Sequence, residues 1–220
     1  MATSTLRRLL RGSFALAFVI GIGLIWLRAG AGWASPEPAG ERESSSTVLV
    51  VNADHPLPAG YVVGELVPLV EKVPVAGARV TVAAEVEGPL RRLFAAARAD
   101  GLTRLYVASG YRTAAEQQQL WDAASDKSFV QRPGHSEHQT GLAVDLADLK
   151  VGQGKFGASK AGRWLARNAW RYGFVLRYPA GKESVTGISY EPWHFRYVGR
   201  TVARTCHERH LVLEEYVASR

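Results

Sequence analysis

The chain has 220 residues, of which 47% are apolar and 21% are charged, a composition typical of a globular protein rather than of a disordered or collagen-like one. Lys and Arg outnumber Asp and Glu by 27 to 20, but four arginines and no acid lie in the first 34 residues, so the remainder carries 23 basic and 20 acidic residues, a net charge of +3. That excess is too small to indicate a nucleic-acid partner, and a single cysteine excludes both an intrachain disulfide and a cysteine-cluster metal site.

Residues 1–34 have the pattern of an export segment. Three arginines precede an apolar run at residues 12–27, and small residues follow it up to Ala34. The sixteen residues of the run span about 24 Å as a helix, which is short of the roughly 30 Å of a bilayer core. A cleaved signal peptide and an uncleaved membrane anchor therefore both stay open. With either outcome we expect the rest of the chain to be exported, to the outer face of the cytoplasmic membrane, the periplasm or the cell wall.

Residues 35–47 are rich in Pro, Ser and charge, and they offer little apolar surface to bury. This composition predicts a flexible tether. A folded domain is then expected over residues 48–220, which is long enough for one hydrophobic core and contains no internal repeat.

Local signals predict short strands interspersed with helices in that domain. The expected helices run from Pro89 to Gly101, from a capping box at Thr113 and Glu116 to about residue 124, from Ser159 to Tyr172, after Gly199, and over 211–217. The expected strands lie at residues 105–108, 142–146, 174–177 and 193–198. This mixture predicts an α+β domain with a small, mainly antiparallel sheet flanked by helices.

Three side chains that are far apart in the sequence have the right chemistry for a zinc site: His138, Asp145 and His194. Two imidazoles and one carboxylate leave a fourth coordination position for water, which is typical of catalytic rather than structural zinc. Asp145 follows small and apolar residues, as expected for a ligand on a strand, and His135 is an alternative ligand nearby. Spacing alone leaves open that these are ordinary hydrogen-bonded side chains.

Four further residues are candidates for the chemistry around such a metal. Glu191 precedes His194 by three residues and could act as a general base, or it could be a salt-bridged surface acid. Arg112, between a strand and a capped helix, could bind a carboxylate or an oxyanion, or act as a structural clamp. Gln117 could face the same cleft or solvent, and Trp193 could wall the site or pack in the core.

Taken in order, the motifs resemble the VanY-type zinc D-alanyl-D-alanine carboxypeptidases of the LAS metallopeptidase superfamily. The resemblance covers nearly all of residues 50–217. The matching stretches include Ser109–Arg112, Pro133–Asp145, Tyr172–Pro179 and Tyr190–Gly199. The combination of Ser-x-His-x6-Asp with Glu-x-x-His is highly specific.

The resemblance implies one Zn²⁺ per chain, held by His138, Asp145 and His194, with Glu191 as catalytic base and acid. It further implies that Arg112 holds substrate near the scissile carbonyl and that Ser136 and Gln117 line the site and help to fix the terminal residue, while Trp193 is a candidate for substrate binding. The implied substrate is the peptidoglycan stem peptide, whose terminal D-alanine is removed with a zinc-bound water as nucleophile.

Three alternatives stay open beside the carboxypeptidase: an L,D-carboxypeptidase, a D,D-dipeptidase of the same superfamily, and a non-catalytic module that binds the cell wall. We expect a monomer, and contact with a membrane only through the N-terminal segment if that segment is not cleaved.

Overall fold

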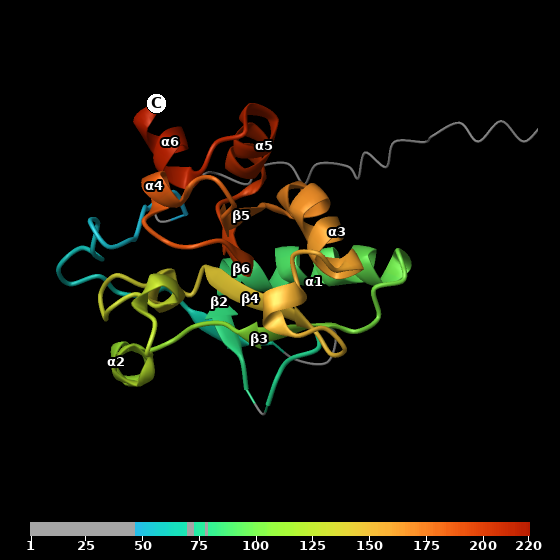
Figure 1. The fold of residues 1–220 in the computed structure, drawn as a ribbon, viewed down its shortest axis with the longest axis horizontal. Helices are drawn as coiled ribbons and strands as arrows, with labels where there is room; N and C mark the ends of the chain where they lie inside the picture. The colour runs from blue at the N-terminus through green and yellow to red at the C-terminus, as the bar shows by residue number, and fades with distance from the viewer. Residues whose placement is uncertain (1–46, 70–72, 78) are drawn as a thin grey trace, which may run out of the picture. The chain divides into compact units, whose positions relative to one another are not determined.

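The computed structural model describes residues 47–69, 73–77 and 79–220 (Figure 1). The export segment expected at 1–34, and all but the last residue of the tether expected at 35–47, lie outside the described residues. No helix in the described part of the chain is both long enough and apolar enough to cross a bilayer.

A four-stranded antiparallel sheet lies at the centre of the domain, with strand order β3-β4-β6-β5. Its strands are β3 (Leu105–Ser109), β4 (Ala143–Asp148), β5 (Phe174–Tyr178) and β6 (Glu191–Tyr197). A smaller antiparallel pair joins β1 (Leu66–Pro68) to β2 (Thr81–Ala83). The predicted α+β class with a small antiparallel sheet is confirmed.

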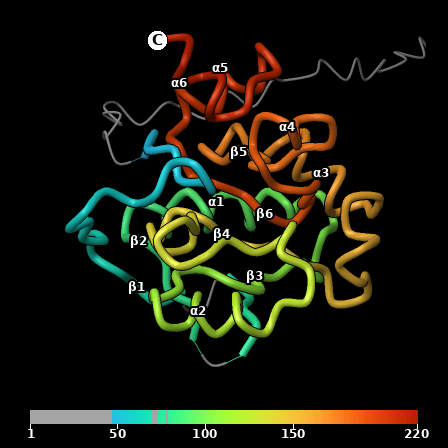
Figure 2. The backbone as a smooth tube through the Cα atoms, turned by 60° about the vertical axis from the view of Figure 1, so that its left-hand side comes forward, coloured from blue at the N-terminus to red at the C-terminus, as the bar shows by residue number. Residues whose placement is uncertain are grey.

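Helices surround this sheet (Figures 1 and 2). The α-helices are α1 (Ala84–Ala99), α2 (Ala114–Ala123), α3 (Lys160–Asn168), α4 (Glu183–Thr186), α5 (Arg200–Arg209) and α6 (Leu213–Ala218). Four short 3₁₀-helices complete the secondary structure: η1 (Lys127–Phe129), η2 (Glu137–Thr140), η3 (Gln153–Lys155) and η4 (Ala169–Tyr172).

The main hydrophobic core forms on one face of the central sheet. It joins apolar residues of α1 and α3 to alternate residues of the strands, among them Val144 and Leu146 of β4 and Phe195 of β6. Because successive strand residues point to opposite faces, Asp145 and His194 project from the other face. The alternation that places apolar side chains in the core therefore also places polar side chains on the second face of the sheet.

Strand register brings two of the expected zinc ligands together. Asp145 of β4 stands directly opposite His194 of β6, and on its other side it pairs with Ser109 at the end of β3. Side chains that face each other across antiparallel strands have Cβ atoms about 4.5–5.5 Å apart. Two residues separated by 48 intervening positions are thus placed within reach of a single ion.

The expected start of the first helix at Pro89 is wrong, because α1 begins five residues earlier, at Ala84. The backbone N–H groups of Ala83 and Ala84 donate to Gly141 and Glu65, so the chain turns from β2 directly into the helix. Pro89 therefore lies inside α1, where it supplies no N–H but has a φ compatible with the helix.

The capping box predicted for the second helix is present. Thr113 Oγ1 accepts a hydrogen bond of 3.2 Å from the backbone N–H of Glu116, whose carboxylate in turn accepts from the N–H of Thr113 at 2.7 Å. The predicted helix that begins after Ser159 is also present, although its last turn is the 3₁₀-helix η4, which ends at Gly173 with φ 87°.

We expect Thr113→Ala to lower the free energy of unfolding by about 1 kcal/mol, because the first turn of α2 loses its side-chain cap. Thr113→Ser keeps the hydroxyl oxygen and should stay close to wild type. Chemical denaturation of the three proteins measures the difference, and equal stability of the Ala and Ser variants would contradict the capping role.

Candidate metal centre and active site

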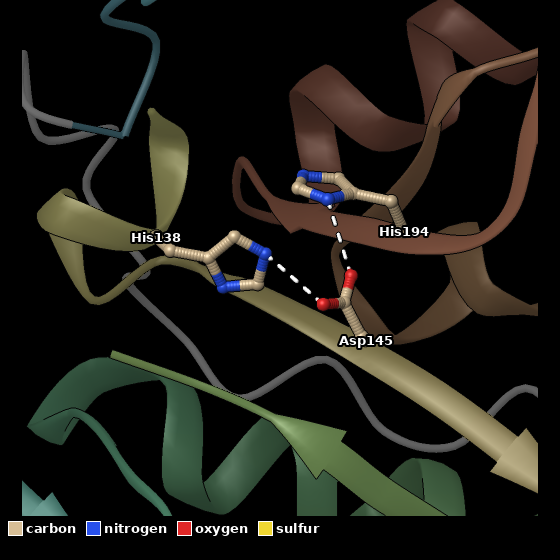
Figure 3. A group of neighbouring side chains, drawn as sticks. All are labelled: His138, Asp145 and His194. Atoms are coloured by element: carbon tan, nitrogen blue, oxygen red, sulfur yellow. Dashed lines mark ion pairs between the residues drawn. The ribbon is translucent and has the colours of Figure 1, made fainter. Parts of the chain in front are cut away.

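Three potential ligands converge on the polar face of the sheet. His138 comes from η2, Asp145 from β4 and His194 from β6, and their ligand atoms all lie within 4.8 Å of one another. Figure 3 shows the two imidazoles on either side of one carboxylate. The Nε2 atom of His138 is 3.2 Å from Asp145 Oδ2, and the Nδ1 atom of His194 is 3.2 Å from Asp145 Oδ1. The structure therefore brings together the three residues expected to bind zinc.

The hydrogen bonds behind the two histidines orient their rings. His138 Nδ1 lies 2.7 Å from the carbonyl oxygen of Gly110, which can only accept, so Nδ1 carries a proton and the lone pair of the neutral ring lies on Nε2. His194 Nε2 lies 3.3 Å from Glu137 Oε2, which leaves Nδ1 for a metal ion, or for a proton when no metal is bound. Both rings thus present a nitrogen to the same point.

The carboxylate between these rings fits a cation. Asp145 Oδ1 is the only buried side-chain oxygen or nitrogen without a hydrogen bond among the residues that the structure describes, although His194 Nδ1 is 3.2 Å away. A buried, unsatisfied carboxylate oxygen is costly, and a divalent cation coordinated by all three side chains would satisfy it. Two imidazole nitrogens and one oxygen are ligands suited to zinc.

The electrostatics of the cluster favour a charged carboxylate. Burial acts to raise the pKa of Asp145, but the two histidines outweigh it and hold that pKa well below its usual range. Burial acts to lower the pKa of His194, but its interactions with the carboxylates of Asp145 and Glu137 prevail and raise it to about 9. A proton therefore competes with a metal ion for this ring.

Glu191 begins β6 and stands beside the ligand cluster. Its Oε2 atom is 3.6 Å from His194 Nδ1, and its side chain is buried. Burial raises the pKa of Glu191 to about 7, with His194 acting against the shift and Asp145 adding to it. A carboxyl group with a pKa near neutrality can both take up and release a proton at physiological pH.

Arg112 is fixed between the end of β3 and α2. Its Nη1 donates to Gln117 Oε1 at 2.7 Å, its Nη2 donates to Ser109 Oγ at 3.2 Å, and its Nη2 is 3.8 Å from Asp145 Oδ2. Gln117 is buried and donates to the backbone carbonyl of Gln131, so it does not point to solvent. The guanidinium is therefore held in place by neighbours and still faces the ligand cluster.

A cavity of about 310 Å³ unites the residues singled out from the sequence. Its lining includes Arg112, Gln117, Ser136, His138, Asp145, Glu191, Trp193 and His194. Trp193 forms part of a wall with Phe129, their ring centroids 6.2 Å apart. His135, considered as an alternative ligand, instead places its Nδ1 2.8 Å from the carbonyl oxygen of Asn52.

Three charged residues next to the cluster were not singled out from the sequence. Glu137, Arg177 and Arg196 have fully buried side chains and are joined by hydrogen bonds. The signal available in the sequence is weak: each arginine stands beside a tyrosine near the end of its strand, a position that is usually on the solvated side of a sheet. Only the structure shows that both arginines turn inward to one carboxylate.

Residues 79–200 match the family model described as VanY, D-alanyl-D-alanine carboxypeptidase. Over 192 residues the chain is 40% identical to a D-alanyl-D-alanine carboxypeptidase of Enterococcus faecalis, an alignment that covers 80% of this chain and 67% of the relative.

The solved structures that are similar to the domain include a zinc-bound VanY and an LD-carboxypeptidase. One is a variant of the vancomycin resistance D,D-pentapeptidase VanY from a VanB-type cassette in complex with Zn(II), at 37% identity and a TM-score of 0.67, covering 78% of this chain and 99% of that chain. The other is the LD-carboxypeptidase LdcB, at 34% identity and a TM-score of 0.70, covering 79% of this chain and 86% of that chain.

We expect His138→Ala to weaken zinc binding by more than about 100-fold, because it removes one of the three ligands. Loss of a residue that only hydrogen-bonds to a ligand costs roughly 10–100-fold in metal affinity. His207→Ala is the control, since His207 is exposed and stacks on Trp170 instead. Competition with a chromogenic chelator measures both affinities. If the two variants bind zinc equally well, the ligand assignment is wrong.

Proposed function

The chain belongs to the VanY family of D-alanyl-D-alanine carboxypeptidases, and on that premise we propose that it removes the terminal D-alanine from peptidoglycan stem peptides with one zinc ion per chain. The observation that carries the proposal is the cavity in which a His-Asp-His cluster, the buried carboxyl group of Glu191 and the guanidinium of Arg112 meet. The similar VanY structure holds Zn(II), and the Enterococcus faecalis relative bears the carboxypeptidase name.

His138, Asp145 and His194 would hold the zinc, which when bound supplies a Lewis acid for the scissile carbonyl and lowers the pKa of a water. Glu191 takes the proton of the attacking water at its carboxylate. It then delivers that proton to the nitrogen of the departing D-alanine, so that the leaving group is a neutral amine. Its burial supports this role, because in the metal-free site burial raises the pKa of this carboxyl group to about 7, a value at which it can both accept and release a proton.

Arg112 stabilises the negative charge that develops on the carbonyl oxygen during attack. Its guanidinium faces the cluster, 3.8 Å from Asp145, and Gln117 and Ser109 restrict its rotation. A donor that is fixed beforehand needs no reorganisation at the moment of reaction. Gln117, Ser136 and Trp193 line the same cavity and would position the terminal residue of the substrate.

The setting of the enzyme follows from its substrate. Peptidoglycan lies outside the cytoplasmic membrane, and the basic and apolar pattern of residues 1–34 supports export, with that segment acting as a signal peptide or as an anchor. We expect the protein to act as a monomer, since one chain supplies all three ligand side chains and the site needs no second copy.

An L,D-carboxypeptidase is the second candidate, favoured by the likeness to LdcB. A module that only binds the cell wall would not need a proton acceptor, so the buried Glu191 beside the metal ligands argues against that alternative. A D,D-dipeptidase would use the same metal and the same proton transfers on a shorter substrate, so the bond that is cut has to be read from products.

We expect the zinc-loaded protein to release one alanine from a stem pentapeptide ending in D-Ala-D-Ala, and to do so faster than from a tetrapeptide or from free D-Ala-D-Ala. Mass spectrometry of the products identifies the bond, and a chelator should stop the reaction until zinc is returned. Preferred cleavage of the tetrapeptide would establish the second candidate, whereas no release from any of the three substrates by zinc-loaded protein would overturn the proposal.

We expect Glu191→Gln to bind zinc as tightly as wild type while kcat falls by a factor of about 10²–10⁴, since the amide cannot accept or return the proton. Glu183→Gln, at an exposed position at the start of α4, should leave kcat unchanged. Steady-state kinetics and zinc titration of both variants decide the matter, and a near-normal rate in Glu191→Gln would remove this residue from the mechanism.

A further inference from the structure

A chain of buried charges leads away from one of the metal ligands. His194 Nε2 contacts Glu137 Oε2 at 3.3 Å, and the other oxygen of Glu137 accepts from Arg177 Nε at 2.7 Å and from Arg196 Nη1 at 3.0 Å. The side chains of Glu137 and both arginines are completely buried. Every one of these contacts is therefore shielded from water.

Arg177 continues the chain of charges to the C-terminal helix. Its Nη1 and Nη2 donate to the two oxygens of Glu214 on α6 at 2.8 Å and 2.6 Å. Glu214 Oε1 also accepts from Asn52 Nδ2 at 2.9 Å. The guanidinium is thus fixed at both ends, by Glu137 on the side of the metal ligands and by Glu214 on the side of α6.

Arg196 continues the chain of charges to the first described residues of the domain. Its Nη2 donates to the backbone carbonyls of Thr47 at 3.2 Å and of Leu49 at 3.1 Å. Together with Asn52, these residues tie the segment 47–52 to the same network. In Figures 1 and 2 that segment lies beside the C-terminal helices, although it is far from them in the sequence.

Stability does not explain this arrangement well. Removing two guanidiniums and a carboxylate from water is expensive, and replacing buried ion pairs by apolar residues is often neutral or stabilising. The two histidines also differ in what lies behind them: a backbone carbonyl, rigid by itself, orients His138, whereas His194 depends on a side chain with rotatable bonds. A side chain in that position has to be held in place by other groups.

We propose that Glu137 is a positioning residue for the metal site: it keeps His194 in the tautomer that turns Nδ1 to the ion, and Arg177 and Arg196 hold Glu137 in that position. A carboxylate that accepts both guanidiniums through one oxygen leaves the other to accept the Nε2 proton of His194. Such a partner fixes the ring orientation and increases its basicity as a ligand. Glu214 and the 47–52 segment act one step further out, by restraining the arginines.

This inference rests on the metal site of the proposed function but not on which bond is cut, so it is tested by metal binding rather than by turnover. Adjacent acids on α6 provide a matched pair. Glu214 contacts Arg177, whereas Glu215 pairs with Lys182 at the surface at 2.7 Å and caps α6 through the backbone N–H of Val212. Both acids support the helix, but only Glu214 is connected to Glu137.

The experiment compares zinc affinities of the full chain by chelator competition. We expect Glu137→Gln to weaken zinc binding about 10–100-fold, and Glu214→Gln to weaken it by about tenfold, the lower end of the range for loss of a partner behind a metal ligand. Glu215→Gln should stay within about twofold of wild type. The melting temperatures of the metal-free proteins are measured as well. If Glu214 only stabilised the fold, Glu214→Gln would lower the melting temperature but would bind zinc as tightly as Glu215→Gln.

A spectroscopic measurement tests the ring orientation directly. Cobalt(II) replaces zinc, and its visible absorption reports the ligand geometry, which should change in Glu137→Gln and not in Glu215→Gln. Equal zinc affinities of the two α6 variants, or a wild-type affinity and spectrum in Glu137→Gln, would overturn the inference. If Glu137→Gln does not fold, the comparison of Glu214→Gln with Glu215→Gln decides. A wild-type chain that binds no zinc would instead overturn the proposed function, and this inference with it.

Discussion

One carboxylate placed between two imidazoles is the constraint on which the rest of the site depends. Asp145 has an oxygen 3.2 Å from a ring nitrogen of each histidine, and one of those oxygens has no hydrogen bond. Nitrogen lone pairs and carboxylate oxygens repel one another unless a proton or a cation lies between them. The fold holds this arrangement by strand register, because Asp145 and His194 face each other across β4 and β6.

Each functional side chain at the site is oriented by a hydrogen bond from a different part of the fold. The carbonyl of Gly110 orients His138, Glu137 orients His194, and Gln117 with Ser109 fixes Arg112. These supports come from the end of β3 and the residue that follows it, from η2 and from α2, and the central sheet and the capping box at Thr113 keep these segments in place. A site built in this way is organised before substrate arrives, which is what electrostatic stabilisation of a transition state requires.

The features that sequence predicted well are those carried by local signals. The capping box of α2 depends on residues three apart, and the spacing of His138 and Asp145 belongs to a motif that is continuous in the chain. The start of α1 was mistaken because Pro89 suits a first turn, whereas the true start at Ala84 is fixed by hydrogen bonds to distant segments. The strands β1 and β2 are three residues each and are too short for a periodic pattern.

The network behind His194 shows what sequence could not provide. Arg177 and Arg196 carry full charges, and such residues are almost never completely buried unless paired. Their partner Glu137 is 40 residues from Arg177 and 59 from Arg196, so only the tertiary fold reveals the pairing. Strand alternation places Arg196 on the same face as His194, but nothing in the local sequence identifies the carboxylate that either arginine meets.

The most direct test of the account is the position of the metal itself, read from the anomalous scattering of zinc in crystals of the loaded protein. The account predicts one peak about 2.0–2.2 Å from His138 Nε2, Asp145 and His194 Nδ1, with solvent at the remaining coordination position. A peak elsewhere, or a fourth protein side chain closing the coordination sphere, would contradict it.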